Sequence, residues 1–349
     1  MSDKYPRVIQ LPLTLQCNSR CAMCNVWNMD HSGEMDASEL AAHLRDPLFQ
    51  EVESVGINGG EPTLIEDLPA YAAAILALPS LRSLNLISNG FRTKTLLETA
   101  KTIRTLCHER NVAFHLSLSL DGYGEVHDRV RGVPGAFEKT TATIDAVMAE
   151  LERYCDSFDV GCTVIRQNVD RLMELEAFAK TRGYPMKYRL GIGNKRIESD
   201  TLLERFSVLN GPERQSAKEF FHYKMHDATT SRERFRYFAI FHWLDSAVPQ
   251  RLLGCMWQNE GVTLDGRGNL YYCAVESERL GSLRESGGEA LFFDPKHLEY
   301  RERLVQEKCD GCIHDYTGPV STEKQWVYLE EFHSRRQAMA CYRIKAGVL

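Results

Sequence analysis

The feature that most constrains the fold is a repeated alternation of apolar, strand-like runs with helical stretches over the first 190 residues. Strands are expected at 8–15, 54–57, 83–87, 113–120, 159–165 and 187–190, with helices at 37–48, 67–78, 94–110, 136–154 and 169–182. About six βα units in succession predict an α/β fold, a partial (β/α)6 barrel of TIM-like type. In such a barrel the chemistry lies in the loops that follow the C-terminal ends of the strands.

The pattern changes twice after this barrel, which predicts three regions: the barrel at 1–193, a helical bridging segment at 194–254 and a small domain at 255–349. The bridging segment either contacts substrate or is a solvated connector. In the last region, 261–264 and 269–272 flank Asp265-Gly266-Arg267-Gly268, a strong hairpin signal. We therefore expect a small β-hairpin plus helix domain.

Composition excludes several classes of protein. The net charge of −6 argues against a nucleic-acid binder, which normally carries a basic face. No apolar run approaches the roughly 18 residues that a membrane span requires. The first residues lack the basic and apolar regions of a secretory signal. We therefore expect a cytoplasmic protein with neither a nucleic-acid partner nor a membrane partner.

The first cysteine group is Cys17, Cys21 and Cys24, in C-x3-C-x2-C spacing directly after the first expected strand. Disulfides rarely persist in the cytosol, so the spacing of the cysteines is the informative property. Three thiolates on one loop can hold an iron–sulfur cube and leave one iron open, as catalytic metal sites do. The amino and carboxylate groups of S-adenosylmethionine (SAM) could chelate that iron. A zinc knuckle or three buried cysteines is the alternative.

A second motif, Gly59-Gly60-Glu61-Pro62, follows the second expected strand. Its glycines would let the backbone approach a ligand closely. Glu61 could accept hydrogen bonds from the methionyl ammonium of SAM. Alone the motif indicates a turn, but after the cysteine triplet and at a strand end it indicates a cofactor site.

With these motifs in this order, residues 8–193 resemble the radical SAM superfamily. The resemblance implies a partial (β/α)6 barrel, a [4Fe–4S] cluster on the three cysteines and SAM beside it. Reductive cleavage of SAM then gives a 5′-deoxyadenosyl radical. The family often has an aromatic residue before the third cysteine, where this chain has the apolar Met23.

The resemblance extends to other strand ends. Ser88-Asn89-Gly90 matches a polar turn near the cofactor, and 117–122 ends the fourth strand with Ser119 and Asp121. In related enzymes with cluster-bearing C-terminal domains, the positions of Ser119 and Arg131 contact the ribose and the methionyl carboxylate. The alternative is a strand-end turn with a surface arginine.

The second cysteine group combines Cys255 and Cys273, which bracket the hairpin, with Cys309 and Cys312. Four thiolates suit either a fully ligated [4Fe–4S] cluster or tetrahedral zinc. The region resembles the twitch form of the SPASM domain, which implies one auxiliary cluster. Cys107, Cys155 and Cys162 are expected to be packing residues, and His242 and His314 packing or surface residues.

Radical SAM enzymes of this type act on varied substrates. Few residues precede the first strand, and the auxiliary spacing resembles an aminocyclitol dehydrogenase. We therefore expect oxidation of a small polar molecule such as an aminocyclitol, sugar or nucleotide-sugar, with a flavodoxin or ferredoxin as electron donor. Glu276 is the candidate base. Peptide maturation, epimerisation with Cys341 as thiol donor, and a non-enzymatic iron–sulfur or zinc scaffold are the alternatives.

Overall fold

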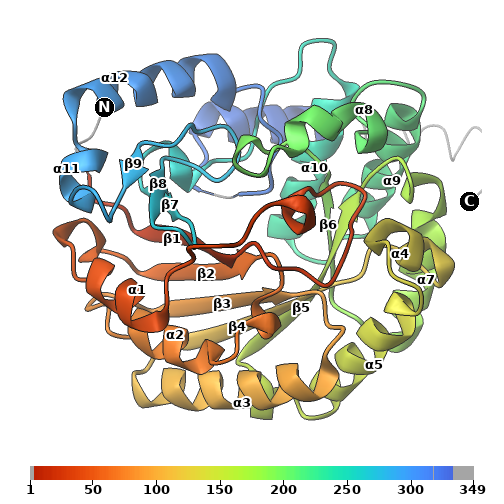
Figure 1. Ribbon diagram of the computed structural model, residues 1–349. Coiled ribbons are helices and arrows are strands. Elements are labelled where there is room, and N and C mark those ends of the chain that lie inside the picture. Colours follow the sequence, from red (N-terminus) through yellow and green to blue (C-terminus); the bar gives the residue numbers. More distant parts are fainter. Residues whose placement is uncertain (1–3, 317, 333–349) are drawn as a thin grey trace, which may run out of the picture.

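The computed structural model describes residues 4–316 and 318–332, which contain one nine-stranded sheet (Figure 1). The strand order is β6-β5-β4-β3-β2-β1-β7-β8-β9. The six barrel strands are β1 (Val8–Thr14), β2 (Ser54–Gly59), β3 (Ser83–Ser88), β4 (Ala113–Ser119), β5 (Ser157–Val164) and β6 (Met186–Leu190). All neighbouring pairs among them are parallel. The expected partial barrel is confirmed.

Helices connect these strands and form the layer outside the sheet (Figure 1). Those of the barrel are α1 (Ala37–His43), α2 (Leu68–Ile75), α3 (Thr93–Glu109), α4 (Glu125–Arg131), α5 (Ala136–Ala149), α6 (Leu151–Tyr154) and α7 (Leu172–Arg182). The helix expected at 37–48 ends at His43, because Asp46 caps a separate turn that begins at Pro47. The chain then continues into α8 (Leu203–Phe206), α9 (Glu213–Asp227) and α10 (Ser231–Asp245).

The expected hairpin is present and joins the barrel sheet. Its strands are β7 (Gly261–Leu264) and β8 (Asn269–Tyr271), followed by β9 (Gly281–Ser282), α11 (Gly288–Phe292) and α12 (Pro295–Leu304). β7 pairs in parallel with β1, and β8 pairs antiparallel with both β7 and β9. The hairpin therefore covers the edge of β1 that the barrel leaves unpaired, which removes an exposed strand edge. A domain boundary at 255 stays a prediction.

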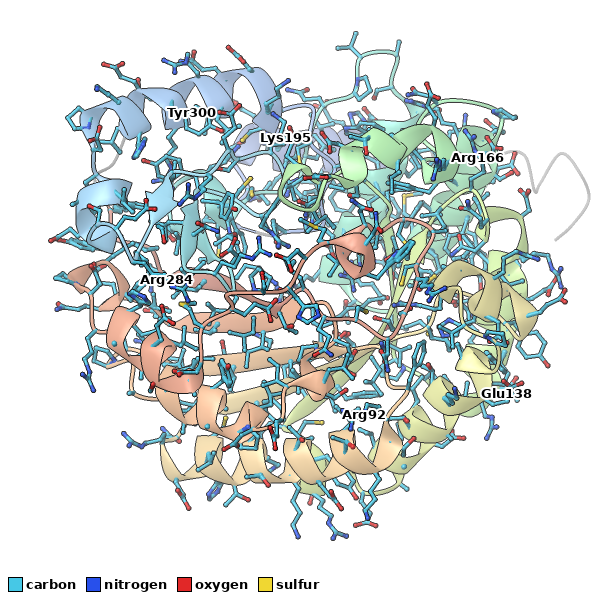
Figure 2. The ribbon with its side chains drawn as sticks, in the orientation of Figure 1. Arg92, Glu138, Arg166, Lys195, Arg284 and Tyr300 are labelled. Atoms are coloured by element: carbon cyan, nitrogen blue, oxygen red, sulfur yellow. The ribbon has the colours of Figure 1, made fainter. Side chains whose placement is uncertain are left out.

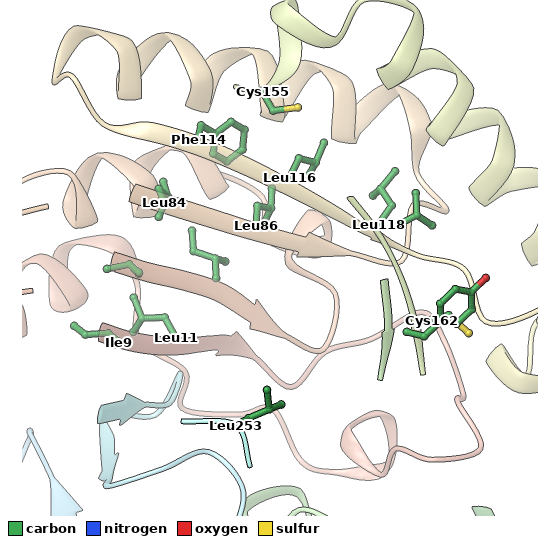
Figure 3. Packing of buried hydrophobic residues seen from close by; sticks show 14 of the residues in the cluster. Ile9, Leu11, Leu84, Leu86, Phe114, Leu116, Leu118, Cys155, Cys162 and Leu253 are labelled. Atoms are coloured by element: carbon green, nitrogen blue, oxygen red, sulfur yellow. The ribbon is translucent and has the colours of Figure 1, made fainter. Parts of the chain in front are cut away.

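The two faces of the sheet differ in polarity because successive side chains of a strand point to opposite sides. The outward face carries apolar side chains such as Ile9, Leu84 and Leu116, which pack with the helices (Figure 3). The inward face carries polar residues such as Gln10, Asn85 and Ser117, and a cavity of about 1060 Å³ is lined mainly by the first halves of the strands. In a closed TIM barrel, apolar side chains fill this space. Here polar side chains surround an open cavity instead, which leaves room for a ligand.

α10 forms one wall of this interior cavity through Arg232, Glu233, Phe235 and Arg236. The interpretation of 194–254 as a solvated connector is therefore wrong for α10. In residues 4–316 and 318–332, no helix has both the length and the apolar character needed to cross a bilayer.

Candidate functional site

The first cysteine group lies on the loop after β1, at the C-terminal mouth of the barrel. Backbone hydrogen bonds hold this loop against the end of α4, from Arg20 N to Arg131 O (2.8 Å) and from Ala22 N to Val130 O (2.9 Å). Gly132 permits this approach, because a Cβ there would lie 2.6 Å from the Arg20 oxygen and its φ is +65°. The contacts with α4 thus hold the backbone of the loop in place.

The three thiols share a small volume. Burial, to which the neighbouring Cys21 and Cys24 add, raises the pKa of Cys17 to about 12. Burial likewise raises the pKa of Cys24 to about 11, with Cys21 adding to the effect. Iron binds the thiolate form, so cluster assembly must release protons from these thiols.

Within the described part of the chain, no three His, Cys, Asp or Glu side chains converge as they would around one metal ion. The expectation of a cluster on this loop therefore rests on the spacing of its cysteines. The loop also provides an apolar shield, because Ala22 and Met23 pack against a small cluster of Val130, Ile165 and Phe206.

The glycines of the second motif serve backbone packing within the protein. A Cβ on Gly59, whose φ is +132°, would lie 2.4 Å from the Thr14 oxygen, and one on Gly60 would lie 2.0 Å from the Gln16 oxygen. Gly60 N and Glu61 N donate to those same two oxygens. The motif therefore fastens the end of β2, and Pro62 after it, to the start of the cysteine loop. Its contact with SAM stays a prediction.

Glu61 connects three loops at the barrel mouth. Its side chain is 1% exposed. Oε1 accepts hydrogen bonds from Thr63 N (3.1 Å), Thr63 Oγ1 (2.7 Å) and Ser88 Oγ (2.7 Å), and Oε2 accepts one from Asn89 N (2.8 Å). Asn89 in turn donates to Asn18 Oδ1 (2.7 Å) on the cysteine loop. Only Oε2 retains clear capacity to accept from the methionyl ammonium.

Arg131 and Asp121 form a buried ion pair beside the cysteine loop. Arg131 is 8% exposed and Asp121 is fully buried, so the interpretation of Arg131 as a surface residue is wrong. Arg131 Nη2 lies 2.5 Å from Asp121 Oδ2, and Nη1 donates to Cys21 Sγ at 3.7 Å. Burial alone lowers the pKa of Arg131, but Asp121 and Cys21 outweigh it and raise that pKa overall. Ser119, at the end of β4, is half-buried.

Arg131→Gln is expected to lower the free energy of unfolding by about 3–5 kcal/mol, because it leaves the buried Asp121 carboxylate unpaired. The double variant Asp121→Asn, Arg131→Gln should regain part of that loss, since it removes both charges. Anaerobic urea unfolding measures both. From the resemblance we also expect Arg131→Ala to weaken SAM binding at constant iron content, a prediction that the structure does not test. Equal stability of the single variant and the unmodified protein would contradict the ion-pair role.

The second cysteine group surrounds a small cavity of about 40 Å³, which Cys255, Cys273, Cys309 and Cys312 all line. Backbone amides point at two of the sulfurs, from Glu276 N to Cys273 Sγ (3.3 Å) and from His314 N to Cys312 Sγ (3.5 Å). Burial, with the neighbouring Cys255 and Cys273, raises the pKa of both Cys309 and Cys312 to about 11. Four close thiols with amide donors match the surroundings of an iron–sulfur cluster.

Arg251 organises this cavity, and sequence reasoning missed it. Its side chain is 2% exposed. The guanidinium donates to the backbone oxygens of Leu253 (2.8 Å), Gly254 (3.1 Å), Cys312 (3.1 Å), His314 (2.7 Å) and Tyr316. It thereby ties the segment before Cys255 to the loop after Cys312. A single arginine in a loop carries no sequence signal for this role.

One layer of residues separates the barrel cavity from the cysteine cavity. Trp257 lines both, and its ring stacks on Tyr316 at 3.9 Å and 16°. Between the two cavities, Asp315 faces the barrel interior and lies 3.0 Å from Arg236 and 3.9 Å from Arg189. His314, expected to be a packing or surface residue, lines the cysteine cavity and accepts a hydrogen bond from Tyr316 N (3.1 Å).

Glu276 also lines the cysteine cavity and lies 4.0 Å from Lys195 Nζ, on the loop after β6. Figure 2 shows Lys195 above the barrel sheet, on the side of the C-terminal elements. Lys195 N donates to Val275 O (2.9 Å), which fixes the two loops together. Cys341 lies outside the described residues. Cys107, Cys155 and Cys162 are at most 1% exposed, which confirms them as packing residues.

Comparison with known proteins identifies the barrel. A family model described as the radical SAM superfamily matches residues 11–179. Residues 11–179, just under half of the chain, form a radical SAM domain. Proteins of this superfamily use SAM and a [4Fe–4S] cluster, which the first cysteine loop is expected to hold here.

Individual radical SAM relatives differ in function. The AdoMet-dependent heme synthase of Methanosarcina barkeri is 31% identical over 186 residues, which are 51% of this chain and 48% of the relative. The pre-heme d1 synthase of Dinoroseobacter shibae is 29% identical over 54% of this chain and 45% of the relative. The sporulation killing factor maturation protein SkfB of Bacillus subtilis is 28% identical over 41% and 33%. The chain thus matches about half, or less, of the length of these relatives.

Solved structures share the fold over most of the chain. Native anSMEcpe with bound AdoMet and Kp18Cys peptide superposes with a TM-score of 0.63 at 16% identity, covering 97% of this chain and all of that chain (100%). Streptococcus suis SuiB bound to precursor peptide SuiA superposes with a TM-score of 0.59 at 16% identity, covering 85% and 67%. At this identity the likeness concerns the fold.

Proposed function

We propose that this radical SAM enzyme carries a second, auxiliary [4Fe–4S] cluster and catalyses the net oxidation of a small polar substrate. The observation that carries the proposal is the cavity lined by Cys255, Cys273, Cys309 and Cys312, one residue layer from the barrel interior. A fully ligated cluster has no open iron for a reactant, and at this position it suits electron acceptance.

In the proposed reaction, the cofactors supply a radical and an electron acceptor, and the chain supplies a base. When bound, SAM and the first cluster supply a radical that abstracts a hydrogen atom from substrate carbon, and the auxiliary cluster supplies an electron acceptor. A carbinol that has lost one hydrogen atom becomes a carbonyl when it also loses its hydroxyl proton and one electron. The chain must therefore provide a base near both cavities.

Glu276 is the better placed of the carboxylates near the wall. It lies in the wall of the cysteine cavity on a loop tied to the end of β6. Asp315, unlike Glu276, lines the barrel cavity, but it is held by two arginines. Burial alone raises the pKa of Asp315, whereas Arg189 and Arg236 outweigh it and lower that pKa well below its usual range. A carboxylate with so low a pKa is a weak base.

The lining of the barrel cavity suits a substrate rich in hydroxyl and amino groups. Asp159 accepts hydrogen bonds from Ser117 Oγ (2.6 Å) and Lys187, and lies 2.9 Å from His115 Nε2. These fixed donors and acceptors line a cavity of about 1060 Å³. Small-molecule sites usually have a few such polar groups in a volume of about 300–1000 Å³.

A peptide substrate is the second candidate. The barrel cavity is at the upper limit of the small-molecule range, which leaves room for a peptide segment. In addition, anSMEcpe and SuiB, which share the fold, were solved with bound peptides. Net oxidation of a residue in a peptide would use the same base and the same electron acceptor.

For net oxidation we expect a product lighter by the mass of two hydrogen atoms, with no solvent deuterium at carbon. Glu276→Gln should lower kcat roughly 100-fold while SAM cleavage persists, because the proton has lost its acceptor. Cys341→Ala should retain activity. Mass spectrometry on aminocyclitol, sugar and peptide panels measures these outcomes. Deuterium gained at unchanged oxidation state, and abolished by Cys341→Ala, would replace oxidation by epimerisation.

A further inference from the structure

Arg196 is unusual among the arginines of the described chain. Eight of them have a buried Nε without a hydrogen-bond partner: Arg104, Arg131, Arg166, Arg189, Arg196, Arg236, Arg267 and Arg301. Six of the other seven have a hydrogen bond or an ion pair through another guanidinium nitrogen. The seventh, Arg189, has an ion pair of 3.9 Å from its Nε to Asp315. Arg196 has neither a hydrogen bond nor an ion pair with any described residue. Such a group calls for a missing partner.

The position of Arg196 suggests where that partner binds. It lies on the short turn Lys195–Ile197 that follows β6, so it is at the mouth of the barrel. Its charge interacts with Cys24 on the first cysteine loop, with Asp265 and Tyr271 on the hairpin, and with Tyr316 on the wall of the cysteine cavity. Arg196 is therefore located between the first cysteine loop and the wall of the second cysteine cavity.

No described acidic group neutralises Arg196. Asp265 is the nearby carboxylate, but it already accepts hydrogen bonds from Arg267 N (2.9 Å), Asn269 N (2.9 Å), Asn269 Nδ2 (3.0 Å) and Tyr271 OH (3.1 Å). These bonds hold the hairpin turn and keep Asp265 in place. Burial lowers the pKa of Arg196 even though Asp265 and Tyr271 act to raise it. A guanidinium partly withdrawn from water without a counterion is costly.

We propose that Arg196 binds a carboxylate or phosphate group at the barrel mouth, between the two cysteine groups. Its planar fork of donors matches the paired oxygens of such an anion. The anion has two possible sources, the methionyl carboxylate of SAM and an acidic group of the substrate. Arg131 is already engaged with Asp121 and Cys21, so it is less free to bind either of them. The inference deepens the proposed function by specifying an anionic group on the ligand.

The first arm of the test measures binding of SAM and of decarboxylated SAM to the reconstituted protein by equilibrium dialysis. If Arg196 holds the methionyl carboxylate, Arg196→Gln should weaken SAM binding roughly 10- to 100-fold and leave decarboxylated SAM unaffected. Arg196→Lys should retain part of the affinity, because it keeps the charge without the fork. The control is Arg205→Gln, which removes an exposed arginine on the next helix.

The second arm uses protein saturated with SAM and titrates inorganic phosphate by calorimetry. If Arg196 holds a substrate anion, phosphate should bind the unmodified protein and the Arg205→Gln variant equally. Arg196→Gln should then lose roughly 10-fold or more in phosphate affinity, with SAM binding unchanged. The two arms thus assign the anion to SAM or to the substrate.

The proposal is overturned if Arg196→Gln leaves both SAM and phosphate binding unchanged. The proposal would also be overturned if Arg196→Gln shifted the midpoint potential of a cluster and left SAM and phosphate affinity unchanged. Arg196 would then only compensate the charge of that cluster. Absence of net oxidation or of the auxiliary cluster would overturn the proposed function instead. Neither of those failures changes the two binding measurements.

Discussion

Replacement of Cys17, Cys21 and Cys24 by alanine is expected to remove about four of about eight irons per chain and all formation of 5′-deoxyadenosine from SAM. The physical reason is that each thiolate is a ligand on the same loop, and SAM has no iron to bind without them. Anaerobic reconstitution followed by iron analysis and incubation with dithionite and SAM measures both quantities. The loop itself should stay folded, because its backbone is held by α4.

Cys107→Ala is the matched control, since Cys107 is fully buried on α3 and belongs to neither cysteine group. It should keep both the iron content and SAM cleavage. Residual 5′-deoxyadenosine from the triple variant would show that the first loop is not the catalytic site. No 5′-deoxyadenosine from the unmodified, fully reconstituted protein would favour the scaffold alternative over an enzyme.

Removal of the second group has a different expected signature. The double variant Cys309→Ala, Cys312→Ala should lose about four irons and yield no oxidised product, yet still form 5′-deoxyadenosine. SAM cleavage depends on the first loop, whereas the oxidation needs an acceptor for the second electron. Iron analysis, 5′-deoxyadenosine formation and product mass spectrometry on one preparation separate these steps.

Metal content decides between the two occupants of the second site. Near one equivalent of zinc together with about four irons per chain would refute the auxiliary cluster and support tetrahedral zinc. Cys155→Ala provides the control, because Cys155 is 1% exposed and far in sequence from both groups. Its metal content should equal that of the unmodified protein.

Much of the fold follows from local sequence patterns. The succession of apolar, strand-like runs and helical stretches predicted the parallel sheet, and β1 to β6 match the expected ranges within a few residues. Asp265-Gly266-Arg267-Gly268 predicted the hairpin between β7 and β8 because turn chemistry is local. The spacing of Cys17, Cys21 and Cys24 likewise indicated a shared site, since three residues on one short loop cannot lie far apart.

The partners of buried charges could not be predicted in this way. Arg251 donates to carbonyls on both sides of the second cysteine group, and the distance in sequence to Tyr316 is 65 residues. Nothing in the neighbourhood of Arg251 specifies that loop. The motif likewise did not reveal that the fold surrounds the Glu61 carboxylate with Thr63, Ser88 and Asn89, while the contact of Glu61 with SAM stays a prediction.

The sequence by itself determined the barrel, the hairpin and the identity of both cysteine groups, because periodicity, turn chemistry and short spacings act over a few residues. The tertiary structure alone decided that β7 pairs with β1 and that Trp257 and Tyr316 separate two cavities. It also decided that Arg196 has no described counterion while Arg131 has one. These outcomes depend on which distant segments pack together, and burial sets the energetic consequence of each charge only after that packing exists.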